Sequence, residues 1–341
     1  MENIRFAVVG FGHIGRRHAT IISQLSEAEL VAVIEPNADQ LRSELLPEGV
    51  PTFETIDQLF SSSLQTDVLC ICTPNGYHTP YALKAIRNGS HALIEKPMGL
   101  HADSCKEVIN EADRFGKRVF VVKQNRFSPP VKWMKQVVEN GTLGDILQVQ
   151  INCYWNRDDR YYHGDTWKGS EDLDGGVLFT QFSHFIDIMH WIFGDVTNIR
   201  SRIYNHTHRA NTQFADSGNA IFDFVKGGAG CIQFTTSTWD KNFESSITVL
   251  GSKGTIRVGG QYMNEVEYAH IENYQMPQLP KTNPPNDYGP FTGSAANHHY
   301  VIENVIQTLR AGSSDTNAME AMTVVDIIER IYAANDLNTL W

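Results

Sequence analysis

A glycine-rich turn follows the first apolar run of the sequence. The run Arg5–Val9 leads into Gly10-Phe11-Gly12-His13-Ile14-Gly15, and a segment with helical spacing, Arg16–Leu25, comes next. In this context Gly10 permits a tight turn, Gly12 lets a pyrophosphate approach the backbone, and Gly15 lets the helix pack against the strand. His13 and Ile14 stand at the helix start, whose N–H groups attract phosphates. The motif predicts a dinucleotide site; the alternative is a glycine turn without a ligand.

An acidic residue ends the second apolar run, Leu30–Ile34. Glu35 follows Gly15 by 20 residues, which is the spacing at which a carboxylate bonds the ribose hydroxyls and repels a 2′-phosphate. The sequence therefore predicts NAD rather than NADP as cofactor. The alternative is a solvated acid at the end of a strand.

Two further polar motifs follow apolar runs. Thr73-Pro74-Asn75 comes after Asp67–Ile71, and Glu95-Lys96-Pro97 comes after Ala92–Ile94. Since ligands bind outside the carboxyl ends of parallel strands, both motifs are expected to share one rim with the glycine turn. A lysine there can hold a substrate hydroxyl and stabilise developing oxyanion charge. The alternative for Lys96 is an ordinary surface lysine.

A histidine lies in the apolar helical pattern expected over Val177–Phe193. Thr180, His184, Asp187 and Trp191 are spaced to form one stripe of that helix. Because its pKa lies near neutral pH, His184 could take the proton of a hydroxyl as hydride leaves the same carbon. The alternative is a core histidine.

The segment before this helix mixes aromatic and basic residues. Arg157, Tyr161, Trp167 and Lys168 suit a sugar that carries an anionic group, because rings stack on sugars and guanidinium forks bind carboxylate or phosphate. We expect Arg157, Arg160 and Lys168 to converge with Lys96 and Arg126. The alternative is a loop packed by its own aromatics.

The pattern of apolar and polar residues changes near residue 125. Before it, near-continuous apolar runs alternate with helical segments, as expected for a parallel sheet covered by helices. After it, strands alternate in polarity, which indicates a largely antiparallel sheet with helices to one side. The proline-rich stretch Gln275–Gly293 is expected to be an extended loop, and helices are expected over Asn297–Leu309 and Ala318–Ala334.

Composition limits the class of partner. The chain has 341 residues, 41% of them hydrophobic, and a net charge of −11, so it can bury a large core but lacks the basic character of nucleic-acid binders. It shows neither a signal-peptide pattern nor an apolar run of membrane-spanning length. The five cysteines include no CxxC pair, and the chain is expected to be cytoplasmic and reduced.

Three motifs together resemble the Gfo/Idh/MocA family of NAD(P)-dependent sugar and polyol oxidoreductases. They are Gly10-x-Gly12-x-x-Gly15-x-x-His18, Thr73-Pro74-Asn75-x-x-His78 and Glu95-Lys96-Pro97. The resemblance implies an α/β chain with an N-terminal Rossmann domain (doubly wound parallel sheet), 1–125. A C-terminal α+β substrate and oligomerisation domain with a large, open, mostly antiparallel sheet, 126–341, would follow, and the C-terminal helix could pack back on the first domain.

The same resemblance assigns roles to individual residues. It implies that Lys96 is the catalytic lysine and that the Lys96–Pro97 bond is cis. Residues implied to line the cofactor and substrate sites include His78, Gln124, Arg126, Asn297 and His298. No metal is expected, because the adjacent His298 and His299 point apart on a helix and have no carboxylate or cysteine cluster near them in the sequence.

A narrower resemblance concerns the substrate. Many family members carry an aspartate where this chain has Thr180, followed by Gln181. The order Trp167-Lys168-Gly169, His184 and Asp187 is similar to the WlbA/WbpB-type branch. That branch also lacks the aspartate, and it oxidises C3 of UDP-N-acetylglucosaminuronate for surface-polysaccharide synthesis.

The resulting hypothesis is an NAD-dependent nucleotide-sugar dehydrogenase. An inositol or free-sugar dehydrogenase of the same family is the nearest alternative. A non-catalytic NAD/sugar sensor and an NAD-dependent glycosidase are alternatives of other classes. A homodimer or homotetramer through the C-terminal sheet is expected, with Gly230–Trp239 as a candidate strand.

Overall fold

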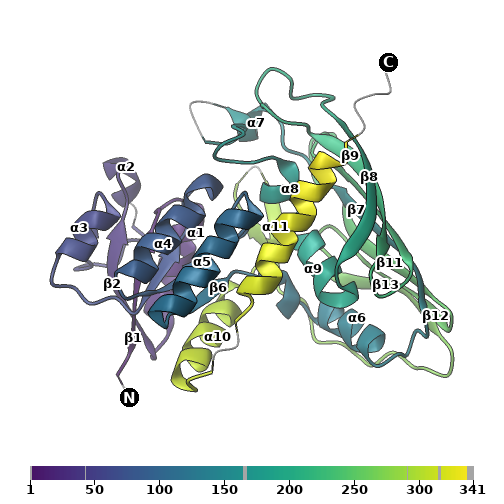
Figure 1. Ribbon diagram of the computed structural model, residues 1–341, viewed down its shortest axis with the longest axis horizontal. Coiled ribbons are helices and arrows are strands. Elements are labelled where there is room, and N and C mark those ends of the chain that lie inside the picture. Colours follow the sequence, from purple (N-terminus) through teal and green to yellow (C-terminus); the bar gives the residue numbers. More distant parts are fainter. Residues whose placement is uncertain (1, 43, 164–166, 290, 314–315, 336–341) are drawn as a thin grey trace. The chain divides into compact units, whose positions relative to one another are not determined.

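The computed structural model describes residues 2–42, 44–163, 167–289, 291–313 and 316–335 (Figure 1). These residues form two compact units. The first contains 2–122 and 298–322, and the second contains 123–297 and 323–335. The division falls three residues before the position expected from the sequence, and a late segment of the chain belongs to the first unit.

The first unit is built on a parallel sheet of six strands. Their spatial order is β3-β2-β1-β4-β5-β6, with bounds Thr52–Phe53, Ala28–Ile34, Ile4–Val9, Val68–Ile71, His91–Ile94 and Val119–Val121. The apolar runs are buried, as expected for strands covered on both faces. The helices are α1 (His13–Gln24), α2 (Ala38–Leu41), α3 (Ile56–Ser61), α4 (His78–Arg87), α5 (Ala102–Phe115) and α10 (His298–Arg310), with the 3-10 turn η1 (Asn75–Tyr77).

A side chain from the late segment closes the edge of this sheet. The Asn317 carboxamide accepts a hydrogen bond from the Val121 N–H at 2.9 Å and donates one to the Val121 carbonyl at 2.7 Å. The amide therefore takes the place of a further strand on β6.

The second unit contains a mixed sheet of seven strands. Their order is β13-β12-β11-β7-β10-β9-β8, with bounds Glu265–Ile271, Gly254–Gly259, Glu244–Gly251, Ile146–Tyr154, Ala229–Thr235, Ser217–Phe224 and Val196–Tyr204. Only β7 and β10 pair in parallel among the described strands of this sheet. The mostly antiparallel prediction is confirmed, and α6 (Pro129–Glu139) and α9 (Ser183–Phe193) lie along one face (Figure 1).

The predicted continuous helix over 177–193 is wrong. The chain forms α8 (Val177–Thr180) and then α9, because the Phe182 N–H reaches back to the Val177 carbonyl at 3.0 Å and ends the first helix in a wider turn. Thr180 and His184 therefore stand on two consecutive helices rather than on one unbroken stripe.

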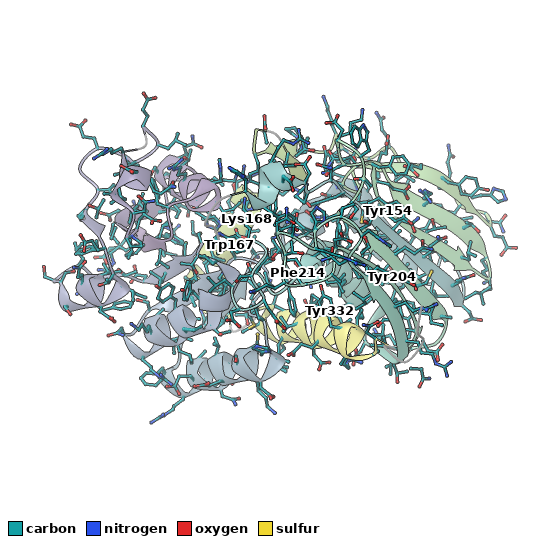
Figure 2. All side chains as sticks on the ribbon, turned by 90° about the horizontal axis from the view of Figure 1, so that it is seen from above. Tyr154, Trp167, Lys168, Tyr204, Phe214 and Tyr332 are labelled. Atoms are coloured by element: carbon teal, nitrogen blue, oxygen red, sulfur yellow. The ribbon has the colours of Figure 1, made fainter. Side chains whose placement is uncertain are left out.

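Gly176 fixes the entry to α8. Its φ is 115°, which disfavours any other residue, and a Cβ there would lie 2.7 Å from the Tyr332 hydroxyl and 3.6 Å from Phe214. The Tyr332 hydroxyl also accepts a hydrogen bond from the Leu178 N–H at 3.1 Å. Tyr332 belongs to α11 (Ala318–Ala333), and Figure 2 shows it together with Phe214.

The stretch Gln275–Gly293 is not wholly an extended loop. Pro285–Asp287 (β14) pairs with Thr292–Ala295 (β15), and Asn286 between the paired residues is buried. Two short helical elements, α7 (Asp159–Tyr162) and the 3-10 turn η2 (Gln124–Phe127), complete the described elements. None of the helices within the described ranges has the length and apolar character needed to cross a bilayer.

Candidate active site

The glycine turn of the first unit has the geometry that a dinucleotide site needs. A Cβ at Gly10, whose φ is 86°, would lie 2.7 Å from the Cys72 carbonyl oxygen. One at Gly15 would overlap the Gly10 carbonyl oxygen at 1.8 Å, so the helix can approach the strand only without a side chain. A Cβ at Gly12 would meet nothing within 4 Å. The space beside Gly12 is therefore open to a phosphate at the start of α1, and His13 and Ile14 occupy the first helical positions there.

Glu35 lies against this turn. Its carboxylate accepts hydrogen bonds from the Phe11 N–H at 2.7 Å and from the Asn37 N–H at 3.0 Å. The Phe11 N–H thus holds the Glu35 carboxylate next to the glycine turn, where the motif predicts the ribose of the dinucleotide.

Replacing Glu35 tests the cofactor preference. We expect Glu35→Ala to weaken NAD binding about 10-fold, since a lost charged hydrogen bond has about this effect. Glu35→Gln keeps an acceptor but removes the repulsion of a 2′-phosphate, so it should raise NADP affinity more than NAD affinity. Titration calorimetry with both nucleotides measures this, and an unchanged NADP-to-NAD ratio in both variants would contradict the role of Glu35.

His78 ties the two polar rim motifs together. Its Nε2 lies 2.9 Å from the Thr73 carbonyl oxygen and its Nδ1 lies 2.6 Å from the Pro97 carbonyl oxygen, and the residue is buried. The Lys96–Pro97 bond is cis, as the resemblance implied. Pro74 is half-buried and Asn75 is buried in the same loop. His78 therefore holds the loops that carry the candidate cofactor residues.

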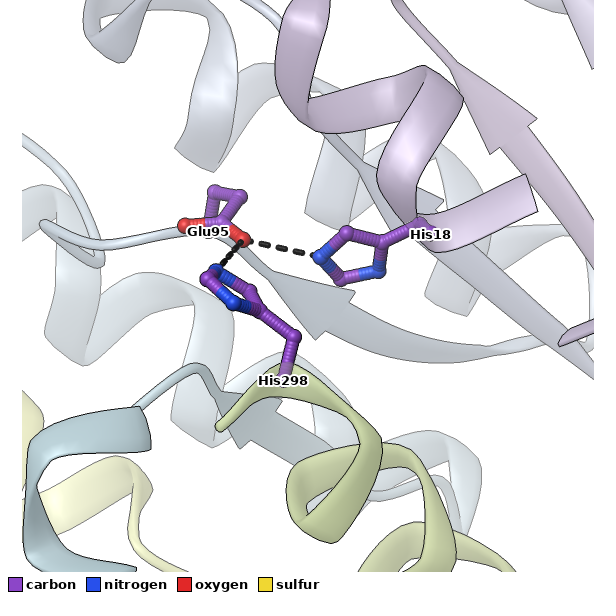
Figure 3. A group of neighbouring side chains, drawn as sticks. All are labelled: His18, Glu95 and His298. Atoms are coloured by element: carbon purple, nitrogen blue, oxygen red, sulfur yellow. Dashed lines mark hydrogen bonds and ion pairs between the residues drawn. The ribbon is translucent and has the colours of Figure 1, made fainter. Parts of the chain in front are cut away.

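Glu95 is the centre of a buried network (Figure 3). His18 Nε2 lies 2.8 Å from Glu95 Oε1, His298 Nε2 lies 3.6 Å from the same oxygen, and Glu95 Oε2 accepts a hydrogen bond from the Lys96 N–H at 3.2 Å. Burial alone would raise the pKa of Glu95, but the hydrogen bond from His18 and the nearby His298 hold it below its usual value. The network fixes the backbone at Lys96, whose half-buried side chain comes from the end of β5.

This arrangement was not predictable from the sequence. His298 has no carboxylate close to it along the chain, and the fold brings Glu95 to it from 203 residues away. Two histidines and a carboxylate could in principle bind a metal, and their ligand atoms lie within 4.8 Å of one another. Tetrahedral zinc ligands stand about 3.3 Å apart, whereas His18 and Glu95 are at hydrogen-bond distance. Neither Nδ1 has a hydrogen-bond partner among the described residues, although metal-bound histidines usually have one. The geometry fits a hydrogen-bonded network better than a metal site.

The network predicts that the protein loses stability in acid. Burial lowers the pKa of His298 to about 3, below the value of about 6.5 in an unfolded chain. The unfolded chain therefore binds the proton first, so stability is full above pH 6.5 and falls as the pH drops toward 3, by up to about 1.4 kcal/mol per pH unit. We expect His298→Gln to flatten the decline of urea-unfolding stability between pH 7 and pH 5. His270→Gln, at an exposed histidine, is the control, and equal slopes in all three proteins would refute the assignment.

In the second unit, His184 stands near the start of α9 and Asp187 follows one turn later. His184 is 8% exposed and Asp187 is 2% exposed. Two guanidinium nitrogens of Arg126 donate to Asp187, Nε at 2.8 Å and Nη2 at 2.6 Å, and Lys123 Nζ lies 2.9 Å from Asp187. Burial would raise the pKa of Asp187, but the charges of Lys123 and Arg126 hold it below its usual value. These bonds join η2 to the helix that carries His184.

Arg126 is therefore engaged with the protein itself. Besides Asp187, its guanidinium lies 5.0 Å from the Trp191 ring centre, so it is anchored on two sides. Lys123, which the sequence analysis did not single out, is 7% exposed and shares the same carboxylate. The signal that could have found it is its position at the end of the last parallel strand, one residue before Gln124.

Arg157 lies inside a cage of three rings, which we call the Arg157 cage. Its guanidinium carbon is 4.9 Å from the Trp155 ring centre, 5.3 Å from that of Tyr161 and 5.1 Å from that of Phe291. Its hydrogen bonds go to neutral acceptors, including Gln181 Oε1 at 3.0 Å. No described carboxylate forms a salt bridge with it, and burial lowers its pKa. Within the described part of the chain, the cage thus holds a buried cation that is bonded to no carboxylate.

Lys168 adds a second cation at the same place. Its ammonium lies 4.0 Å from the Tyr161 ring centre, and burial followed by the charge of Arg157 lowers its pKa. Trp167, beside it, is half-buried, and Figure 2 shows both residues. Arg160 approaches Phe291 at 5.4 Å but pairs with Asp158 at 2.6 Å and is half exposed. Of the second-unit cations that were expected to converge, Arg157 and Lys168 both lie over the Tyr161 ring, whereas Arg126 is hydrogen-bonded to Asp187.

Gln124 and Asn297 are tied together. The Asn297 amide nitrogen donates to the Gln124 carbonyl and to the Ser128 hydroxyl, both at 3.2 Å, and its oxygen accepts from Asn283 at 2.7 Å. The side chain of Asn297, predicted to meet substrate, is thus used to join η2 to the segment before α10.

Thr180 and Gln181 end α8. The Gln181 amide nitrogen donates to the Tyr161 hydroxyl at 2.8 Å while its oxygen holds Arg157. The Thr180 hydroxyl donates to Asp174, a buried carboxylate that the sequence analysis did not identify. These contacts connect the aromatic and basic segment to the residues just before His184.

Both parts of the chain match models of one protein family. Residues 4–123 match the oxidoreductase family model with an NAD-binding Rossmann fold, and residues 131–257 match the C-terminal domain model of the same family. These matches agree with the glycine-turn geometry and with the two sheets described above.

Individual relatives are similar over most of the chain. The WlbA dehydrogenase of Bordetella pertussis, solved in complex with NADH and UDP-GlcNAcA, is 29% identical with a TM-score of 0.86, over 98% of this chain and 96% of that one. The WlbA dehydrogenase of Chromobacterium violaceum, solved with the same two ligands, is 26% identical with a TM-score of 0.87, over 98% and 94%. The glucose-6-phosphate 3-dehydrogenase of Bacillus subtilis is 25% identical over 83% of each chain. The chain belongs to the Gfo/Idh/MocA family of oxidoreductases, with an NAD-binding Rossmann domain at its N-terminus.

Proposed function

We propose that the chain is an NAD-dependent dehydrogenase that oxidises a ring hydroxyl of an anionic nucleotide sugar, with C3 of UDP-N-acetylglucosaminuronate as the first candidate. The observation that supports an anionic substrate is the pair of cations Arg157, inside the Arg157 cage, and Lys168, beside it. A guanidinium buried among neutral acceptors is costly unless a negative ligand compensates it. A sugar carboxylate would supply that charge, and Tyr161 and Trp167 would stack on the ring.

The proposed chemistry divides between two residues. When NAD is bound, its nicotinamide supplies the hydride acceptor. His184 takes the hydroxyl proton, and the Lys96 ammonium stabilises the negative charge that develops on the same oxygen. The carbon would give a hydride to the nicotinamide and its hydroxyl oxygen a proton to His184, so that the C–OH group becomes a ketone. The similarity to WlbA enzymes and to a glucose-6-phosphate 3-dehydrogenase supports this class of reaction and an anionic substrate.

A substrate panel tests the proposal. We expect NADH formation with UDP-N-acetylglucosaminuronate and much less with UDP-N-acetylglucosamine, glucose or myo-inositol. Arg157→Met should raise KM for the acidic sugar at least 10-fold and narrow the preference over the neutral one. Arg209→Gln, at an exposed arginine of the same unit, should leave both constants unchanged. If a free sugar or an inositol is turned over in preference to the nucleotide sugar, the proposed substrate is wrong. Release of a free sugar without net NADH would indicate a glycosidase, and stoichiometric NAD binding without any turnover would indicate a sensor.

We further propose that the open face of the second sheet forms a symmetric interface between copies of the chain. The described helices α6 and α9 cover one face (Figure 1), whereas Ile221 on β9 and Tyr268 on β13 are 57% and 52% exposed. Exposed apolar side chains on a sheet face that no described helix covers are often buried by a partner. Small-angle scattering at micromolar concentration should give the mass of a dimer or tetramer, and Ile221→Arg should shift it toward the monomer. A monomeric wild-type protein would refute the interface.

A further inference from the structure

Two tyrosines of the first unit form a stacked pair at the surface. Tyr77 ends η1 directly before α4, and Tyr81 follows four residues later, on the same side of the helix. Their ring centres are 5.9 Å apart with an interplanar angle of 29°. Tyr77 is 44% exposed and Tyr81 is half-buried. The opposite side of α4, which is buried, carries His78, Thr79, Ala82, Ala85 and Ile86. The pair therefore lies outside the core of the unit and presents aromatic surface to solvent.

The side of α4 that carries the pair faces the strands next to the glycine turn. Lys84, one turn after Tyr81, forms a salt bridge with Asp57 at 2.8 Å. Asp57 belongs to α3, which follows β3, and β3 pairs with β2, whose end leads into Glu35. Burial raises the pKa of Tyr81, and the Glu35 carboxylate also raises it. Because salt screens charges beyond about 10 Å, Tyr81 lies in the neighbourhood of Glu35.

This position fits the base end of a dinucleotide. The open space beside Gly12 is suited to the pyrophosphate, and Glu35, held by the Phe11 N–H, is the residue expected to bind the ribose hydroxyls. The adenine is attached to that ribose, so it must lie within a few bond lengths of Glu35. An adenine is flat on both faces and gains binding free energy by stacking on aromatic side chains.

We propose that Tyr77 and Tyr81 form a stacking platform for the adenine of the bound dinucleotide. The inference uses the NAD-binding character of the first unit and does not depend on which sugar is oxidised. Stacking uses the flat face of a base, which every purine has. The platform therefore selects a purine ring rather than a particular exocyclic group, and the two tyrosines are binding residues remote from the reacting nicotinamide.

Titration calorimetry without a sugar tests the platform. Replacing both residues, Tyr77→Ala with Tyr81→Ala, should weaken binding of NAD and of ADP-ribose about 5- to 100-fold, the range for the loss of base stacking. Tyr77→Phe with Tyr81→Phe should restore most of the affinity, because the ring and not the hydroxyl stacks. Nicotinamide hypoxanthine dinucleotide, which keeps the purine ring, should bind the wild type within about threefold of NAD. Unchanged NAD affinity in the double alanine variant would overturn the proposal.

A second measurement separates stacking from an indirect effect on the fold. In saturation-transfer NMR, the adenine protons of bound NAD should receive strong saturation from the wild type. In the double alanine variant the adenine signals should fall relative to those of the nicotinamide, whereas a misfolded protein would lose both. If NAD affinity fell while the ratio of adenine to nicotinamide signals stayed at the wild-type value, Tyr77 and Tyr81 would act through the structure of α4 and the platform would be refuted.

Phe115→Ala is the matched control. Phe115 is a 41% exposed aromatic of the same unit, and it ends α5, which runs back from the carboxyl end of β5. It therefore lies at the opposite edge of the sheet, and its loss should leave both NAD affinity and the NMR signal ratio unchanged. Because no sugar is present, these measurements remain decisive if the wild type oxidises no nucleotide sugar. In that case the proposed function is wrong and the platform is judged by its own result.

Discussion

Lys96→Met is expected to lower kcat about 10³-fold while leaving NAD affinity within twofold of the wild type. Methionine keeps the length of the side chain and removes the ammonium, so the variant loses the charge that is proposed to stabilise the developing oxyanion. Removing one such donor from other active sites costs 10²- to 10³-fold. The backbone at this position is held by Glu95 and should keep its place. Steady-state kinetics and NAD titration measure the two quantities.

The control for this prediction is Lys84→Met. Lys84 lies in the same unit, is partly exposed and pairs with Asp57 at 2.8 Å, so its loss should not change kcat. Lys96→Arg keeps the charge but not the point geometry of the ammonium and should retain intermediate activity. Turnover of Lys96→Met at a tenth or more of the wild-type rate would remove Lys96 from the reaction.

His184→Asn is expected to lower kcat 10²- to 10⁴-fold, the range of a lost general base. It should also change the shape of the pH profile. In the wild type, kcat/KM for oxidation should rise with pH as the proposed base loses its proton, and this acidic limb should be absent from the variant. A stopped assay across pH 5 to 9 shows both effects.

His190→Asn is the matched control, because His190 belongs to the same helix and is half-buried. It should preserve both the rate and the acidic limb. If His184→Asn kept the wild-type pH profile at reduced rate, the histidine would be a structural residue of α9 and another group would remove the proton.

Local motifs were predictable from the sequence because each motif contains its own geometric reason. Gly10 is required by its positive φ, and Gly15 is required because a Cβ there would overlap the Gly10 carbonyl oxygen. Glu35 directly follows the second strand of a regular strand–helix repeat. Contacts across long sequence separations were not predictable. His298 reaches Glu95 because α10 contacts α1, and Lys123 reaches Asp187 because η2 contacts α9.

The break between α8 and α9 shows why periodicity failed at Thr180. The apolar pattern continues through Gln181 and Phe182, so nothing in the spacing marks an end. The helix ends where the Phe182 N–H donates to the Val177 carbonyl and where Tyr332 packs on Gly176. Tyr332 lies 156 residues after Gly176 in the chain. The hydrogen bond from the Thr180 hydroxyl to Asp174 was not predictable for the same reason.

The return of residues 298–322 to the first unit has a consequence for biosynthesis. The buried apolar side of α10, with Val301, Ile302 and Val305, is made after the whole of the second sheet. Domains usually fold in order as they leave the ribosome, yet here a nascent chain ending at residue 122 lacks α10, His298 and Asn317. The cofactor-binding unit can therefore be completed only after the strands of the second sheet and residues 298–322 have been synthesised. A functional exchange of this unit between relatives would have to graft both segments together.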